Sequence, residues 1–112
     1  NTSYAAPSTT QYHPGVAKAW VKFTGATGAT TASYNSTSVS RTSTGLYTWT
    51  IGTNFSSANW CALGMAWNTG SNDPYTVAVV GQAASTLDIE VRSRNGVLTD
   101  VTSVYLAGFG DQ

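Results

Sequence analysis

The chain has 112 residues and a formal net charge of zero, with 9% charged and 12% aromatic residues. Five basic residues in a neutral chain give no positive surface for nucleic acid or anionic lipid, so we expect no nucleic-acid partner and no membrane insertion. A single cysteine excludes an internal disulfide. The composition predicts one globular domain whose polarity comes from serine, threonine, asparagine and glycine.

Residues 1–15 show no periodicity and contain two prolines, which predicts a linker leading into a single domain over residues 16–112. The chain begins at Asn1 rather than Met, and we expect it to be cut from a longer polypeptide. The lone histidine, His13, lies in this linker directly before a proline. A general base needs a nucleophile and an orienting partner nearby, so His13 is interpreted as an exposed linker residue.

The segment 16–25 alternates with period two, as a half-buried strand does. Its inward face is predicted to hold Ala17, Ala19, Val21 and Phe23, and its outward face Lys18, Trp20 and Lys22. A tryptophan between two lysines on an outer face has three interpretations. Trp20 packs under a loop of its own domain, the Lys18/Trp20/Lys22 face lies against a neighbouring subunit, or Trp20 contacts a ligand directly.

Two further segments, 46–51 and 60–67, also alternate. The first predicts an inward face of Tyr47, Trp49 and Ile51. The second predicts an inward face of Cys61, Leu63, Met65 and Trp67, opposite Trp60, Ala62, Gly64 and Ala66. On this assignment Cys61 is a buried and unreactive thiol, since buried cysteine behaves as a small hydrophobic residue.

Segment 86–94 predicts Leu87, Ile89 and Val91 inside, with Asp88, Glu90, Arg92 and Arg94 outside. Asp88 and Glu90 share a face, as the two carboxylates of a glycosidase would. Arg92 and Arg94 continue the same face, however, which favours a salt-bridged solvent surface. The last segment, 103–109, is apolar on both faces.

Glycine-rich turns separate these short segments, and helical periodicity is absent over three turns anywhere in the sequence. This pattern predicts an all-β fold, an antiparallel β-sandwich of seven to nine strands. No histidine, cysteine and carboxylate cluster has metal-ligand spacing, and no glycine loop is suited to phosphate. The sequence therefore predicts no enzyme, no metal and no cofactor.

Aromatic side chains among small amides and hydroxyls are typical of recognition surfaces for proteins and sugars. The longest polar connection in the second half, residues 67–75, lies between two aromatic residues, and such loops often carry recognition. The alternative is a plain hairpin connection, and the alternation leaves Trp67 open as a core residue. The predicted ligand contacts are Trp60, Trp67, Asn68, Asn72, Asp73 and Tyr75.

Four stretches together resemble a domain found at the C-terminal end of tailed-bacteriophage tail-fibre and related virion proteins. They are "PGVAKAWVKFTG", "ASYNSTSVSRTSTGLYTWTI", "FSSANW" and "LDIEVRSRNGVLTDVTSVYLAGFG", and they extend from Pro14 to Gly110. The chain has Leu46 where the family tends to have aspartate and Trp60 where it has tyrosine. The family supplies no catalytic residues to carry over.

The resemblance implies a jelly-roll-like sandwich that assembles as a homotrimer on the exterior of a virion. Its partners would be other virion proteins on the N-terminal side and a polysaccharide or protein of the host surface. The Lys18/Trp20/Lys22 face would then be the subunit contact. Two alternatives stay open: a capsid-decorating or head-fibre protein, and a carbohydrate-binding module of a secreted bacterial enzyme.

Overall fold

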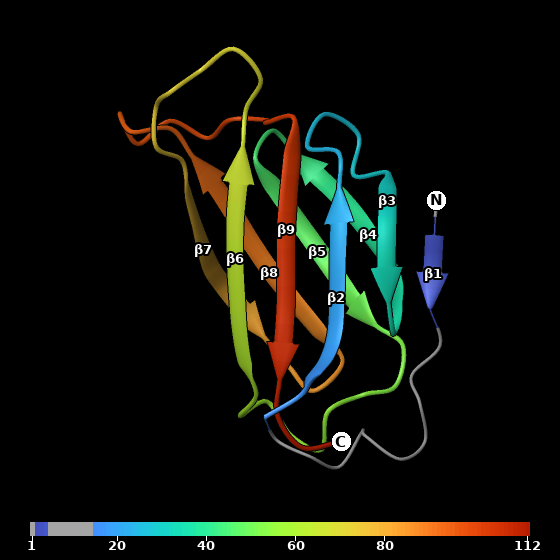
Figure 1. Ribbon diagram of the computed structural model, residues 1–112. Helices are drawn as coiled ribbons and strands as arrows, with labels where there is room; N and C mark the ends of the chain where they lie inside the picture. The colour runs from blue at the N-terminus through green and yellow to red at the C-terminus, as the bar shows by residue number, and fades with distance from the viewer. Residues whose placement is uncertain (1, 5–14) are drawn as a thin grey trace.

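The computed structural model describes residues 2–4 and 15–112, and every regular element in these residues is a β-strand (Figure 1). The all-β prediction is confirmed, and the strand count falls within the predicted range. The nine strands are β1 (Thr2–Tyr4), β2 (Ala17–Phe23), β3 (Thr30–Tyr34), β4 (Ser36–Ser43), β5 (Leu46–Ile51), β6 (Cys61–Trp67), β7 (Thr76–Gln82), β8 (Thr86–Arg92) and β9 (Ser103–Phe109). The linker residue His13 lies outside the described residues.

Two sheets pack face to face, as Figure 1 shows. One has five strands in the order β1-β3-β2-β9-β6, and the other has four in the order β4-β5-β8-β7. All pairings are antiparallel except that of β1 with β3, which is parallel. No strand was predicted at Thr2–Tyr4, because three residues are too few to show a period.

The core lies between the two sheets and draws on both of them. The predicted inward faces of β5 and β8 are confirmed, since Tyr47, Trp49, Leu87 and Ile89 are at most 2% exposed. The buried apolar residues are Ala19, Val21, Phe23, Tyr47, Trp49, Ile51, Phe55, Trp60, Leu87, Ile89, Val91, Val101, Val104 and Leu106.

Lys18 lies inside the protein, contrary to the prediction that it faces outward. Its side chain is buried, and its Nζ donates a hydrogen bond of 2.6 Å to the carbonyl oxygen of Gly110. The reason is a shift in the register of β2 on β9 between Ala17 and Ala19, which makes Lys18 an extra residue in its strand. Such a bulge reverses the face to which a side chain points.

The predicted face of β6 is also wrong. Leu63, Met65 and Trp67 are 57%, 69% and 51% exposed, and Cys61 is exposed as well. The inward side of β6 has no room for large side chains: a Cβ on Gly64 would lie 2.9 Å from both Leu106 Cδ2 and Val77 Cγ1. The small residues of β6 therefore face the core and the large ones face solvent.

Trp60 fills the core just before β6 begins. Its ring stacks on Phe55 with the centroids 4.4 Å apart and the planes 4° apart, and it meets Trp49 edge-on. Its indole Nε1 donates to the carbonyl oxygen of Ala83 at 2.8 Å. Gly108 permits this position, because a Cβ there would lie 2.8 Å from Trp60 Cζ3.

Candidate functional site

The surface of the five-stranded sheet that points away from the core is called here the outer face, and it is largely apolar. The strand registers align Met65, Tyr105 and Lys22 in one row across β6, β9 and β2. A second row aligns Leu63, Ala107, Trp20 and Tyr34 across β6, β9, β2 and β3.

An open hollow of about 460 Å³ lies on this side of the sheet, where β6 and β9 meet. It is lined by Leu63, Gly64, Met65, Tyr105, Leu106 and Ala107. Lys22 is the charged side chain of the two rows, and its Nζ lies 5.4 Å from the centroid of the Tyr105 ring. The electrons of the Tyr105 ring attract the Lys22 ammonium group and partly compensate its charge. The two rows are therefore apolar except for this one paired cation.

The predicted subunit contact of Lys18, Trp20 and Lys22 is therefore divided. Trp20 and Lys22 lie on the outer face, and Trp20 is half-buried beside Tyr34 and Ala107. Lys18 is buried within its own chain and belongs to no surface. Leu63, Met65 and Tyr105 were not predicted from the sequence as parts of this face. For Leu63 and Met65, the small residues that alternate with them in β6 were the signal that could have placed them outside.

The predicted ligand contacts divide in the same way. Trp60 is 5% exposed, so its assignment as a ligand contact is wrong: the aromatic ring is part of the core. Trp67 is half exposed at the end of β6, and Asn72 and Asp73 are exposed in the β6–β7 connection. Trp67 therefore combines an apolar surface with access to solvent.

Asn68 holds the β6–β7 connection in place. Its Nδ2 donates to the Tyr75 hydroxyl at 3.1 Å, and its Oδ1 accepts from the backbone N–H of Thr102 at 3.2 Å. Tyr75 also packs against the core. Asn68 and Tyr75 thus act as supports for the connection, and they leave Trp67, Asn72 and Asp73 as the side chains that a ligand could reach.

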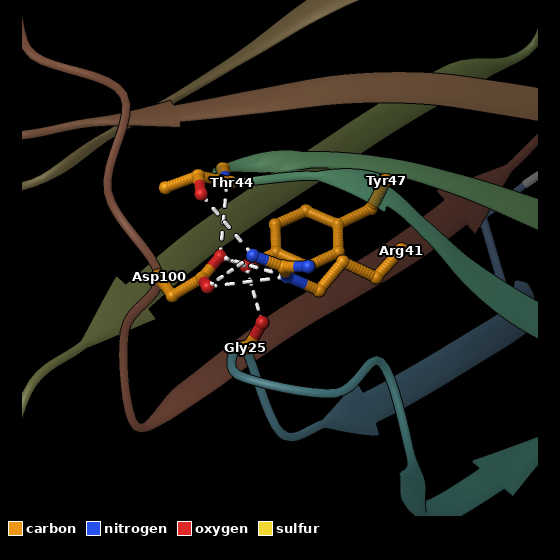
Figure 2. Close-up of polar contacts among 6 residues, drawn as sticks. Gly25, Arg41, Thr44, Tyr47 and Asp100 are labelled. Carbon is orange, nitrogen blue, oxygen red and sulfur yellow. Dashed lines mark hydrogen bonds and ion pairs between the residues drawn. The ribbon is translucent and has the colours of Figure 1, made fainter.

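A polar cluster at the same end of the sandwich fixes the connection before β9 to the β4–β5 turn (Figure 2). Asp100 accepts hydrogen bonds from Arg41 Nη2 at 2.7 Å, Arg41 Nε at 3.1 Å and the backbone N–H of Gly45 at 2.9 Å. The Tyr47 hydroxyl lies 2.7 Å from the carbonyl oxygen of Gly25 and 3.0 Å from Asp100 Oδ1. The contacts of Asp100 join residues more than 50 positions apart in the sequence, which no local pattern reveals.

The same cluster shifts the pKa values of its members. The hydrogen bond from Arg41 is the main cause that lowers the pKa of the Asp100 carboxyl below its usual value. Burial, followed by the hydrogen bond to Asp100, raises the pKa of the Tyr47 hydroxyl. Asp100 is therefore a carboxylate and Tyr47 a neutral phenol at neutral pH. In these states Asp100 accepts hydrogen bonds and Tyr47 donates one, as a contact that holds the connection before β9 against the β4–β5 turn requires.

The carboxylates of β8 lie on the solvent side, as the sequence predicts. Glu90 accepts hydrogen bonds from Arg92 at 3.0 and 3.1 Å, and this pairing lowers the pKa of the Glu90 carboxyl. Asp88 accepts from the Thr48 hydroxyl at 2.7 Å. Arg94 does not continue the row: its Nη1 lies 3.7 Å from Asp73 Oδ1 in the β6–β7 connection.

Cys61 is expected to react readily in the folded protein, because its side chain is exposed at the start of β6. At dilute protein, a maleimide should label native Cys61 within a few-fold of the rate for the unfolded chain. The Cys61→Ser variant is the control for nonspecific labelling, and it should melt like the wild type. Labelling that requires denaturant would contradict this placement.

Within residues 2–4 and 15–112, no three histidine, cysteine or carboxylate side chains gather as metal ligands, and no helix is long and apolar enough to cross a membrane. Comparisons with protein-family models, with curated proteins and with solved structures found no match.

Proposed function

We propose that this chain is an attachment domain on the exterior of a tailed-bacteriophage virion, at the tip of a tail fibre. Several copies would be held together, and each would contact a polysaccharide or protein of the host surface. The phage source and the virion location follow from the resemblance of residues 14–110 to tail-fibre domains. The resemblance also implies a homotrimer, whereas the function requires only that more than one copy is joined.

One observation carries this proposal: the exposed apolar surface of the outer face. Leu63, Met65 and Trp67 are all more than half exposed on one strand. Apolar side chains grouped on a surface mark a site of protein or ligand contact, because covering them releases ordered water. The outer face is therefore the surface that would join copies of the chain, and Trp67 at its end would lie nearest to the ligand.

The ligand contact is assigned to Trp67 with Asn72 and Asp73. An exposed indole covers the apolar face of a sugar ring, and neighbouring amides and carboxylates bond its hydroxyls. Asn68 holds the connection by its hydrogen bonds to Tyr75 and Thr102, so these side chains are presented on an ordered support. Several copies held together would raise the avidity of a weak contact.

The test is binding to an array of bacterial surface polysaccharides, measured with Trp67→Ala and with the double change Asn72→Ala/Asp73→Ala. We expect both to lose binding and to melt like the wild type, since these side chains are exposed. Val80→Ala, exposed to a similar degree on β7, is the matched control and should bind normally. Unchanged binding by both variants of the connection would exclude this end of the sandwich as the ligand site.

A carbohydrate-binding module is the second candidate, and the half-exposed Trp67 ring is the observation that favours it. Such a module would bind soluble glycan as a monomer. An attachment domain instead requires joined copies for firm binding. Binding that stays equally tight in a variant unable to self-associate would favour the module.

A further inference from the structure

In the part of the chain that the structure describes, the two sheets end in four edge strands: β1 and β6 in one sheet, β4 and β7 in the other. An edge strand presents unpaired N–H and C=O groups that can accept a strand from another chain. Proteins protect such edges by making them short, by placing charges or prolines on them, or by interrupting them with bulges. The four edges of this protein differ in this protection.

Three of the edges carry a recognisable protective feature. β1 is only three residues long. β4 carries the charge of Arg41 and two shifts of register against β5. β7 has a shift of register between Val79 and Gly81 and ends at Gln82, whose Nε2 donates to the carbonyl oxygen of Trp60 at 2.6 Å.

β6 has none of these features. It runs for seven residues, contains no charge and no proline, and keeps an unbroken register with β9 from Cys61 to Trp67. Its large side chains point to solvent on the outer face. β6 is thus a regular, uncharged, apolar edge, the kind that favours pairing with a further strand.

The sequence of β6 is complementary to itself about Gly64. In an antiparallel pair centred there, Leu63 faces Met65 of the second strand on the outer side, and Ala62 faces Ala66 on the inner side. Two branched or flexible apolar side chains thus meet on one face, and two methyl groups meet on the other. The absence of charge means that the two copies approach without like-charge repulsion.

From this self-complementarity we infer that β6 pairs antiparallel with β6 of a second copy of the chain, across a twofold axis at Gly64. The pairing gives the unpaired backbone groups of both edges hydrogen-bond partners and makes one continuous sheet of the two five-stranded sheets. It covers Leu63 and Met65 of each copy with those of the other. The inference rests on the proposed function, because it names the partner that joins the copies, and it requires an even number of them.

The pairing is tested with two single-cysteine variants, Leu63→Cys and Met65→Cys, each in a Cys61→Ser background. The Cα atoms of directly opposed residues in antiparallel strands lie about 4.5–5.5 Å apart, within the span of a disulfide. When the two variants are mixed and oxidised, they should give about tenfold more covalent dimer than either variant alone. The reason is that residue 63 of one copy and residue 63 of the other are diagonal neighbours, roughly 7–8 Å apart, and the same holds for residue 65. Val80→Cys in the same background is the control on the protected edge of β7.

The possible outcomes distinguish a failure of the β6 pairing from a failure of the proposed attachment function. Covalent dimer that depends on mixing supports the twofold pairing in this register. The pairing is overturned if either variant alone gives as much covalent dimer as the mixture, or if the mixture gives no more than the Val80→Cys control. A wild-type chain that sediments as a trimer without this cross-link overturns the pairing and leaves the attachment function standing, whereas a strict monomer contradicts both.

Discussion

Trp60→Ala is expected to lower the free energy of unfolding by about 3–5 kcal/mol, the usual range for removing a large aromatic side chain from a core. The change empties the space between Phe55 and Trp49 and deprives the carbonyl of Ala83 of its donor. Chemical denaturation followed by circular dichroism measures the loss. Trp67→Ala is the matched control and should change stability by about 0.5 kcal/mol or less, as exposed substitutions usually do.

The two variants also test which face of β6 is buried. If β6 had the opposite face inward, Trp67→Ala would be the costly change and Trp60→Ala the neutral one. That reversed order would contradict the placement of Leu63 and Met65 on the outer face. Equal losses in both variants would place both rings in the core and remove Trp67 from the candidate ligand contacts.

Asp100→Ala is expected to cost about 2 kcal/mol of unfolding free energy, because it removes a charged hydrogen-bond acceptor that is partly exposed to solvent. The change leaves Arg41 without its ion-pair partner and the backbone N–H of Gly45 without an acceptor. The melting temperature should fall by roughly 8 °C. Asp88→Ala is the matched carboxylate control, since Asp88 accepts from the Thr48 hydroxyl on the solvent side, and it should cost far less.

The lowered pKa of Asp100 gives this contact a defined pH dependence. A carboxyl with a depressed pKa in the folded state stabilises above its unfolded pKa, about 3.9, and loses that contribution as pH falls through the folded pKa. The wild type should therefore lose stability below about pH 4 more steeply than Asp100→Asn. Parallel stability curves for the two proteins between pH 2 and 5, roughly the titration range of a carboxyl, would show that Asp100 is not the titrating group.

The fold class and two of the core strands could be predicted from the sequence because their two faces differ strongly. In β5 and β8, aromatic or branched residues alternate with hydroxyls and charges, so only one assignment buries the apolar set. The same criterion failed for β6, where large apolar side chains lie on one face and only alanine and glycine lie on the other. In β6 the space beside Gly64, which Leu106 of β9 and Val77 of β7 limit, decides which face points inward. The sequence of β6 alone does not contain this information.

Two other features depend on contacts that a single segment does not contain. Lys18 turns inward because of a register shift between β2 and β9, two strands that are far apart in the sequence. The Arg41–Asp100 pair joins the β4–β5 hairpin to the connection before β9, across 59 positions. Of the residues named for the candidate site, Trp20 and Lys22 lie on the outer face, as their alternation predicted. Trp67 also lies there, although the alternation placed it on the inward face, and Trp60 and Lys18 belong to the interior.

Hydrogen exchange of the β6 amides would show whether the outer face and its β6 edge form the contact between copies. Exchange should be compared at dilute and at high protein concentration, with β8 as the internal reference because it is paired on both sides. We predict that alternate amides of Cys61–Trp67 exchange rapidly when dilute and become protected as concentration rises, while β8 stays unchanged. Exchange from β6 that is equally fast at both concentrations would show that β6 does not join copies of the chain.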